Sequence, residues 1–342
     1  MSNPPDYPYD ALEYGDTLEV APGVHWVRMP LPFQLNHINL WLLEDGDGWT
    51  VVDTGFNTDD IRDHWRAIFD RLLAGKPIRR TIITHFHPDH LGLAGWFEAE
   101  YGAEMWMSYA EFLQAHLAWT QSVTHDVDGW MEFFVQNGLD PAVTDRYKAE
   151  RPDFGRGTTK IPITVKRICD DDVIEIGGHN WRAITSGGHS AEHVSLYCES
   201  LNLLISGDQV LPRITTNVSV WYTEPDGDPL RQFINSFDRF RPLPEDVLVL
   251  PSHDRPFRGL HDRLDGLVEH HDERLDAAAA HCKTPRTGMD LLPVLFKRKL
   301  DDHQIAFAMG EALAHLNYLV TAGRLRKFRN DSGQVVFQQK VL

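Results

Sequence analysis

The stretch TIITHFHPDHLG, residues 81–92, places four potential metal ligands within six positions, directly after a short apolar run. Imidazole nitrogens and carboxylate oxygens are good ligands for Zn²⁺ and other divalent first-row metals. His85 and His87 are two residues apart, so they face the same way in an extended segment. Asp89 and His90 lie where the chain turns into a helix. One ion cannot easily take all four side chains, so we expect two neighbouring ions with one pair of ligands each.

Three further potential ligands follow apolar runs later in the chain: His189 in TSGGHS, Asp208 in LLISGD and His253 in LVLPSHD. We expect His189 to complete the first pair, His253 to complete the second, and Asp208 to bridge the two ions. Two ions roughly 3.5–4 Å apart would clamp a shared water and lower its pKa toward about 7, which makes a hydroxide nucleophile. Asp89 would ligate the second ion, orient this nucleophile and accept its proton as the catalytic residue.

The surrounding pattern predicts an α/β fold with two sheets packed face to face and helices outside. Apolar runs at 37–45 and 49–55 flank the turn DGDG and predict a β-hairpin. Apolar residues at helical spacing follow over 57–74, and TIIT predicts a buried strand. Short strands return after residue 161, and a helix is expected over 233–240. These later strands are expected at 163–169, 172–178, 181–188, 194–200, 201–208 and 247–254.

The chain is predicted to form two domains. Residues 1–265 would form the catalytic domain, with a helical insertion at about 104–158 that is rich in Trp, Phe and Met. This insertion either packs on itself or forms a lid over an apolar substrate pocket. Residues 266–342 predict helices followed by a hairpin turning at 331–333, which makes a small winged-helix-like domain.

Composition narrows the classes of function. The 342 residues carry a formal net charge of −17, which argues against a protein whose main task is binding nucleic acid or anionic lipid. Residues 271–342 differ, with 11 Lys+Arg against 8 Asp+Glu, a net of +3. No apolar run approaches the roughly 18 residues that a membrane span needs. The N-terminal stretch lacks a signal-peptide pattern and the three cysteines are widely spaced, so we expect a cytoplasmic protein without a membrane partner.

The motif THFHPDH, followed in order by GGHS, SGD and PSHD, resembles the metallo-β-lactamase-fold hydrolases. The N-terminal hairpin ending in VVDTG fits the same family, and the resemblance covers about residues 20–265. It implies an αββα sandwich with a two-metal site at one edge of the sheets. The family includes glyoxalase II-like thioesterases, lactonases, β-lactamases, phosphodiesterases and RNA-processing nucleases. It also implies that Asp53 orients the ligand cluster, although an Asp after a strand is often only a turn former.

From these features we predict a zinc-dependent hydrolase of a small ester, thioester or lactone. It would hold two divalent ions, with zinc as the default and Mn, Fe or Co as alternatives. We expect His37, Trp221 and Tyr222 near a small acyl substrate and His193 behind the metal ligands. Ordinary packing is the alternative interpretation of these four side chains.

The alternative from another class is a metal-dependent phosphodiesterase or nuclease whose C-terminal domain contacts nucleic acid. Four cations of the tail could then contact phosphates: Arg324, Arg326, Lys327 and Arg329. We favour a tail that packs on the catalytic body or forms a homodimer contact, because the acidic body repels a long polyanion. A redox di-iron enzyme of the same fold is a third interpretation. Those enzymes resemble HxExDH rather than HxHxDH and carry a flavin domain for which this chain has no motif.

Overall fold

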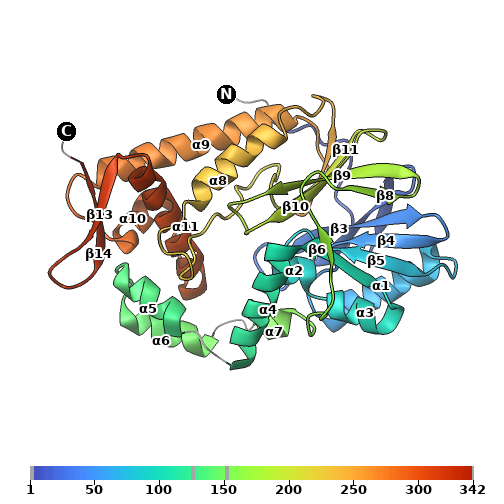
Figure 1. Cartoon of the computed structure of the whole chain (residues 1–342), viewed down its shortest axis with the longest axis horizontal. Coiled ribbons are helices and arrows are strands. Elements are labelled where there is room, and N and C mark those ends of the chain that lie inside the picture. The colour runs from blue at the N-terminus through green and yellow to red at the C-terminus, as the bar shows by residue number, and fades with distance from the viewer. Residues whose placement is uncertain (1–3, 125–127, 151–153, 341–342) are drawn as a thin grey trace.

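Two β-sheets pack face to face, with helices on both outer faces, in this computed structural model (Figure 1). The structure describes residues 4–124, 128–150 and 154–340. Positions 125–127 and 151–153, which fall within the expected insertion, lie outside the described residues. The layers confirm the expected αββα sandwich.

The first sheet has seven strands that follow the order of the chain, and the second has five in the order β12-β11-β10-β9-β8. The first sheet contains β1 (Thr17–Ala21), β2 (Val24–Pro30), β3 (His37–Asp45), β4 (Gly48–Val52), β5 (Ile78–Ile82), β6 (Glu104–Ser108) and β7 (Lys166–Ile168). The second contains β8 (Val173–Ile176), β9 (His179–Ser186), β10 (His193–Cys198), β11 (Leu203–Gly207) and β12 (Leu248–Pro251). The expected hairpin of β3 and β4 is confirmed.

Strand β3 shows why these sequences form a buried sheet. Successive side chains of a strand point to opposite faces. Leu40 and Leu42 pack toward the outer helices, whereas Trp41 and Leu43 belong to the core between the two sheets. Because both faces are covered, the middle of β3 is apolar at every position from Leu40 to Leu43 rather than alternating.

The outer face of the first sheet is covered by α1 (Asp59–Leu72) and α3 (Ala94–Tyr101). Helix α1 begins after the N-cap Thr58, whose side chain accepts the Ile61 N–H. Its apolar residues recur at helical spacing and are buried against the sheet, as the sequence predicted. The second sheet is covered by α8 (Pro229–Ser236) and the start of α9 (Leu260–His281).

The insertion begins later than the sequence predicted. Residues 104–108 form β6, which pairs in parallel with β5, so the expected start of the helical insertion at residue 104 is wrong. The described helices are α4 (Tyr109–Thr124), α5 (Asp128–Gln136), α6 (Pro141–Glu150) and the single turn α7 (Phe154–Gly157). Helices α5 and α6 lie apart from the sandwich and below the C-terminal helices in Figure 1.

The C-terminal unit consists of α9, α10 (Gly288–Leu295), α11 (Asp302–Thr321) and the hairpin of β13 (Leu325–Arg329) and β14 (Val335–Gln339). The predicted order of helices followed by a hairpin is confirmed. Helix α9 runs without a break from the second sheet into this unit, so the expected domain boundary at 265–266 falls inside a helix (Figure 1).

The sequence predicts that His270 and His271 on α9 are solvated, and for His271 this prediction is wrong. The His271 side chain is buried, and its Nδ1 lies 3.3 Å from Nε2 of His315 on α11. Packing of α9 against α8 and α11 explains the burial.

Among the described residues, the helices that are long enough to cross a membrane are too polar to do so.

Candidate metal centre

The His-rich bend lies between β5 and the short helix α2 (Pro88–Leu91). Pro88 occupies the first position of the helix, where its missing N–H costs no hydrogen bond. His87 is the residue before this helix and His90 lies in its last turn, so the bend turns several ligand-type side chains toward one point. His85 and His90 are fully buried.

The other three predicted ligands arrive from the second sheet. His189 follows β9, Asp208 follows β11 and His253 follows β12. Strands β11 and β12 are parallel, and β9 is antiparallel to β10, which is antiparallel to β11. All three strands therefore end at the same edge of the sheet, and this edge faces the bend.

The first trio consists of His85, His87 and His189, whose ligand atoms lie within 4.8 Å of one another. His85 Nε2 is 2.9 Å from His87 Nδ1 and 3.1 Å from His189 Nε2. The second trio consists of Asp89, His90 and His253, and it meets the same distance limit. The structure thus brings together the two ligand sets that the sequence predicts.

Asp208 lies between the two trios. Its Oδ2 is 3.5 Å from His189 Nε2, and its Oδ1 is 3.5 Å from Nε2 of both His90 and His253. His85, His90 and Asp208 also lie within the 4.8 Å limit, which links the two sets directly. A carboxylate with one oxygen toward each set has the geometry of a bridging ligand.

The hydrogen bonds behind the ligands fix which ring nitrogens face the centre. His189 Nδ1 donates to the Asn217 carbonyl at 2.8 Å, and His253 Nδ1 donates to the His37 carbonyl at 2.9 Å. The Nε2 atoms of these rings therefore carry lone pairs toward the centre. Within the described residues, the buried atoms His90 Nε2 and Asp208 Oδ1 have no hydrogen-bond partner. Converging lone pairs and unsatisfied buried acceptors fit divalent cations, so the residues suit the predicted metals.

Residues 34–253 match the model of the metallo-beta-lactamase superfamily. This chain belongs to that superfamily. Residues 275–340 also match the metallo-beta-lactamase-like, C-terminal domain. The chain is similar to a solved beta-lactamase domain protein from Burkholderia ambifaria, with 42% identity, 98% coverage of both chains and a TM-score of 0.92.

Two further relatives are more distant. A solved metallo-beta-lactamase family protein from Thermus thermophilus is 26% identical, with 94% of this chain and 100% of that chain covered and a TM-score of 0.79. The probable metallo-hydrolase YqjP from Bacillus subtilis (strain 168) is 23% identical over 86% of this chain and 91% of its own length. These matches confirm the family resemblance and support a metal-dependent hydrolase.

As in the expectation drawn from the metallo-β-lactamase resemblance, Asp53 contacts the ligand cluster from behind. Its Oδ2 accepts His90 Nδ1–H at 2.7 Å and the Thr84 hydroxyl at 2.9 Å, while Oδ1 accepts the Thr84 N–H at 2.8 Å. Asp53 has φ of 59°, a left-handed backbone that Asp and Asn tolerate better than most residues. This turn places the carboxylate against His90 Nδ1.

Burial sets the protonation of the first trio. It lowers the pKa of His85 and His87 well below the ordinary value and also lowers the pKa of His189. It lowers the pKa of His193 to about 3. His193 lies behind the ligands, where its Nε2 accepts the Asp208 N–H at 3.2 Å. All four rings are therefore neutral at pH 7, the form in which imidazole binds a metal.

In the second trio, nearby carboxylates raise the histidine pKa values instead of leaving them lowered by burial. Burial alone would lower the pKa of His90, but three carboxylates outweigh it and raise this pKa well above the ordinary value: Asp89, Asp53 and Asp208. The pKa of His253 is raised as well, because Asp208 and Asp89 outweigh its burial. Both histidines in turn hold the pKa of Asp208 well below its usual range against burial. The carboxylates around His90 and His253 thus stabilise positive charge at the centre.

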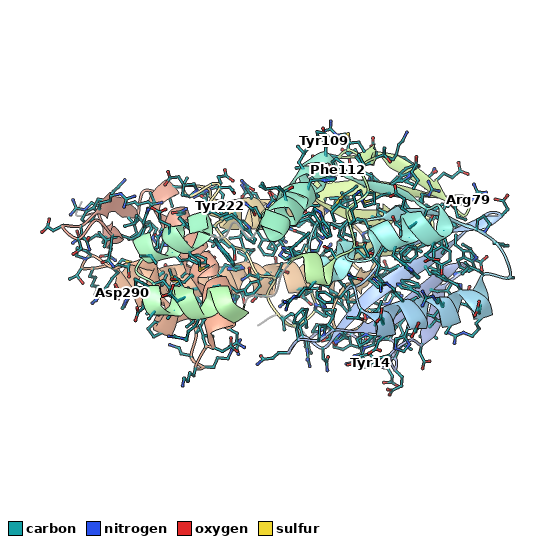
Figure 2. The ribbon with its side chains drawn as sticks, turned by 90° about the horizontal axis from the view of Figure 1, so that it is seen from below. Tyr14, Arg79, Tyr109, Phe112, Tyr222 and Asp290 are labelled. Atoms are coloured by element: carbon teal, nitrogen blue, oxygen red, sulfur yellow. The ribbon has the colours of Figure 1, made fainter. Side chains whose placement is uncertain are left out.

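The three predicted substrate residues lie in different places. The His37 ring accepts the Asp254 N–H at 2.8 Å, its carbonyl orients His253, and burial lowers its pKa to about 4. Trp221 packs on Phe86, with ring centroids 6.4 Å apart. Tyr222 instead lines a cavity of about 460 Å³ beside β13. In Figure 2 it lies between Phe112 of α4 and Asp290 of α10 along the molecule.

Sequence reasoning missed several residues that support the ligands. Thr84 donates to Asp53, and the Asn217 carbonyl holds His189. Glu111 on α4 is fully buried and accepts backbone N–H groups beside two of the ligands. Of these residues, only Thr84 could have been noticed in the sequence, because it lies within the motif of residues 81–92. A backbone carbonyl or a single helix carboxylate has no spacing pattern that would reveal its role.

Proposed function

We propose that this chain is a binuclear-metal hydrolase that cleaves a small ester, thioester or lactone. The observation that carries the proposal is the meeting of two ligand trios around Asp208, with one carboxylate oxygen toward each trio. Two divalent ions held there would supply an activated water as nucleophile and would polarise the substrate carbonyl. Zinc is the metal that we propose first, because the donors are imidazoles and carboxylates.

The chain's own residues would hold and move the proton of the reaction. Asp89 is the more exposed of the two carboxylates at the centre, with a side chain that is 20% exposed against 11% for Asp208. Its Oδ2 lies 3.5 Å from His253 Nε2. We assign to Asp89 the orientation of the attacking water and acceptance of its proton. His193 and Asp53 would hold Asp208 and His90 in place from behind.

Aromatic side chains beside the bend support an acyl substrate. The Phe86 ring lies 4.7 Å from the His87 ring, and it contacts the rings of Phe154 and Trp221 at centroid distances of 6.3 and 6.4 Å. Trp221 in turn stacks on Trp130 of α5, with centroids 6.1 Å apart. This aromatic wall extends from the ligands toward the insertion, and we propose that it would contact an apolar acyl group.

The nucleic-acid alternative has less support in the C-terminal unit. The four tail cations are engaged by groups of the protein. Arg324 pairs with Asp276 at 2.7 Å and Lys327 pairs with Asp226 at 2.7 Å. Arg326 and Arg329 donate to glutamine side chains. We therefore keep the interpretation that the tail packs on the body. A homodimer through this unit stays a prediction.

The cytoplasmic location stays part of the proposal. It is supported by the cysteines, all of which are unpaired in the described structure: Cys169, Cys198 and Cys282.

Metal analysis joined to a hydrolysis screen tests the proposed function. The screen spans p-nitrophenyl esters, acyl-CoA thioesters, lactones, β-lactams and phosphodiesters. We expect two metal equivalents per chain and turnover of at least one ester, thioester or lactone that stops after chelation and returns with Zn²⁺. Turnover of phosphodiesters alone would overturn the substrate class, and a salt-dependent RNA gel shift would then support the nuclease alternative.

A further inference from the structure

One buried carboxylate joins the two chain segments that supply the first ligand trio. Glu111 lies on α4 and is 0% exposed. Its Oε2 accepts the Phe86 N–H at 3.0 Å, and its Oε1 accepts the Glu192 N–H at 2.7 Å. Phe86 stands between the ligands His85 and His87, and Glu192 is three residues after the ligand His189. We propose that Glu111 is a positioning residue that sets the spacing of the first metal's ligands from the insertion helix.

The contact is reciprocal, which makes it stiffer than a single hydrogen bond. The Glu192 carboxylate accepts the Ala110 N–H at 3.2 Å, at the start of α4. The Ser108 hydroxyl donates to the Glu192 carbonyl at 2.7 Å. We call these contacts of Ser108, Ala110, Glu111, Phe86 and Glu192 the clasp. It ties the first turn of α4 to the loop that follows β9.

Both oxygens of Glu111 are needed, because each one accepts a different backbone N–H. Burial raises the pKa of Glu111, whereas the Glu192 N–H, the Ser190 hydroxyl and the Phe86 N–H act in the opposite direction by favouring the ionised form. An amide at this position would present one oxygen and one NH₂ group. The NH₂ group would face an N–H donor, so one of the two segments would be released from the clasp.

The clasp rests on the proposed function, since it matters only if the first trio binds a metal. Partners behind metal ligands typically change metal affinity by about 10–100-fold when they are removed. Insertion helix α4 also begins the segment that carries the aromatic wall to the site. Glu111 therefore connects the placement of this segment to the geometry of His85, His87 and His189.

Titration of the metal-free full chain with Co²⁺ alone, followed by its d–d absorption, tests the proposal. We expect the wild type to bind two equivalents. Glu111→Gln should bind one of them at least 10-fold more weakly, with an altered spectrum for that equivalent. The matched control is Glu192→Gln, which removes a charge from the same clasp but keeps the backbone N–H that Glu111 binds and an oxygen for Ala110.

The possible outcomes separate the clasp from the metal centre. Two equivalents of wild-type affinity and spectrum in Glu111→Gln would overturn the clasp, even if the variant melts at a lower temperature. An equal loss in Glu192→Gln would also overturn it, because the effect would then follow charge rather than position. If Glu111→Gln does not fold, Glu111→Asp, which is too short to reach both donors, decides by the same criterion. A wild type that binds no Co²⁺ would instead refute the proposed function.

Discussion

Replacing Asp53 by Asn is a sharp test of how the second metal's ligands are oriented. Asn tolerates the left-handed backbone at this position, where φ is 59°, and its Oδ1 can still accept the Thr84 N–H. Its NH₂ group, however, would face His90 Nδ1–H at the present distance of 2.7 Å. Two donors cannot share this contact, so His90 would have to move its proton to Nε2, which faces the centre.

The structure allows the size of the effect to be estimated. A ring protonated on Nε2 cannot bind the metal through that atom, and loss of such an orienting partner typically costs about 10–100-fold in metal affinity. This corresponds to about 1.4–2.7 kcal/mol. If the contact is left unsatisfied instead, the buried donors cost about 1–3 kcal/mol of folding stability. Either the affinity for the second metal or the stability must fall.

Competition with a chromophoric chelator measures the affinity of each zinc equivalent, and calorimetric melting measures stability. Asp45→Asn is the matched control. Asp45 is the last residue of β3, at the end of the strand away from His37, and its part-buried carboxylate accepts from Arg80 at 2.6 Å. The variant therefore changes an ion-paired carboxylate away from the ligands. We expect Asp53→Asn to weaken one zinc equivalent while Asp45→Asn leaves both unchanged. Wild-type affinity and melting temperature in Asp53→Asn would refute the orienting role.

The remaining predictions concern the bridge, the substrate wall and the C-terminal unit. Asp208→Ala should lose at least one metal equivalent and most turnover, and full metal content in atomic absorption would remove the bridge from the account. Trp221→Ala should raise KM for long-chain p-nitrophenyl esters more than for the acetate; an equal change for both would contradict the wall. The melting temperature of the metal-free protein should fall as the pH is lowered from about 6.5 to 4. In the folded protein, burial lowers the pKa of His271 to about 2 and that of His315 to about 4, so the unfolded chain takes up protons first in this range. His271→Gln should show a shallower fall in the same melting series, and an unchanged slope would refute this explanation.

The ligands could be predicted from the sequence because each one is a strong metal-binding residue type in a short segment that leaves an apolar strand. In the structure β9, β11 and β12 run in the same direction and end at one edge of the sheet, which brings His189, Asp208 and His253 together. The bend itself is local, and its ligand order is visible in six consecutive residues. The resemblance added Asp53, which spacing alone could not separate from a turn former.

Other features depend on contacts between distant segments, which leave no local pattern. Residues 104–108 contain Met105, Trp106 and Met107, and their pairing with β5 is visible only in three dimensions. His271 looks like a polar helix residue, and it is buried because α11 packs on it. Glu111 is one carboxylate on a helix, and its role depends on two backbone N–H groups that lie 25 and 81 positions away.

Anomalous diffraction from crystals of the zinc-loaded protein, measured on both sides of the zinc edge, shows how many zinc ions bind and which side chains hold them. We expect two peaks roughly 3.5–4 Å apart with Asp208 between them. One peak should be bound by His85, His87 and His189, and the other by the second trio. A single peak, peaks outside this cluster, or a well-folded metal-free preparation with undiminished hydrolysis would refute the proposed two-metal centre.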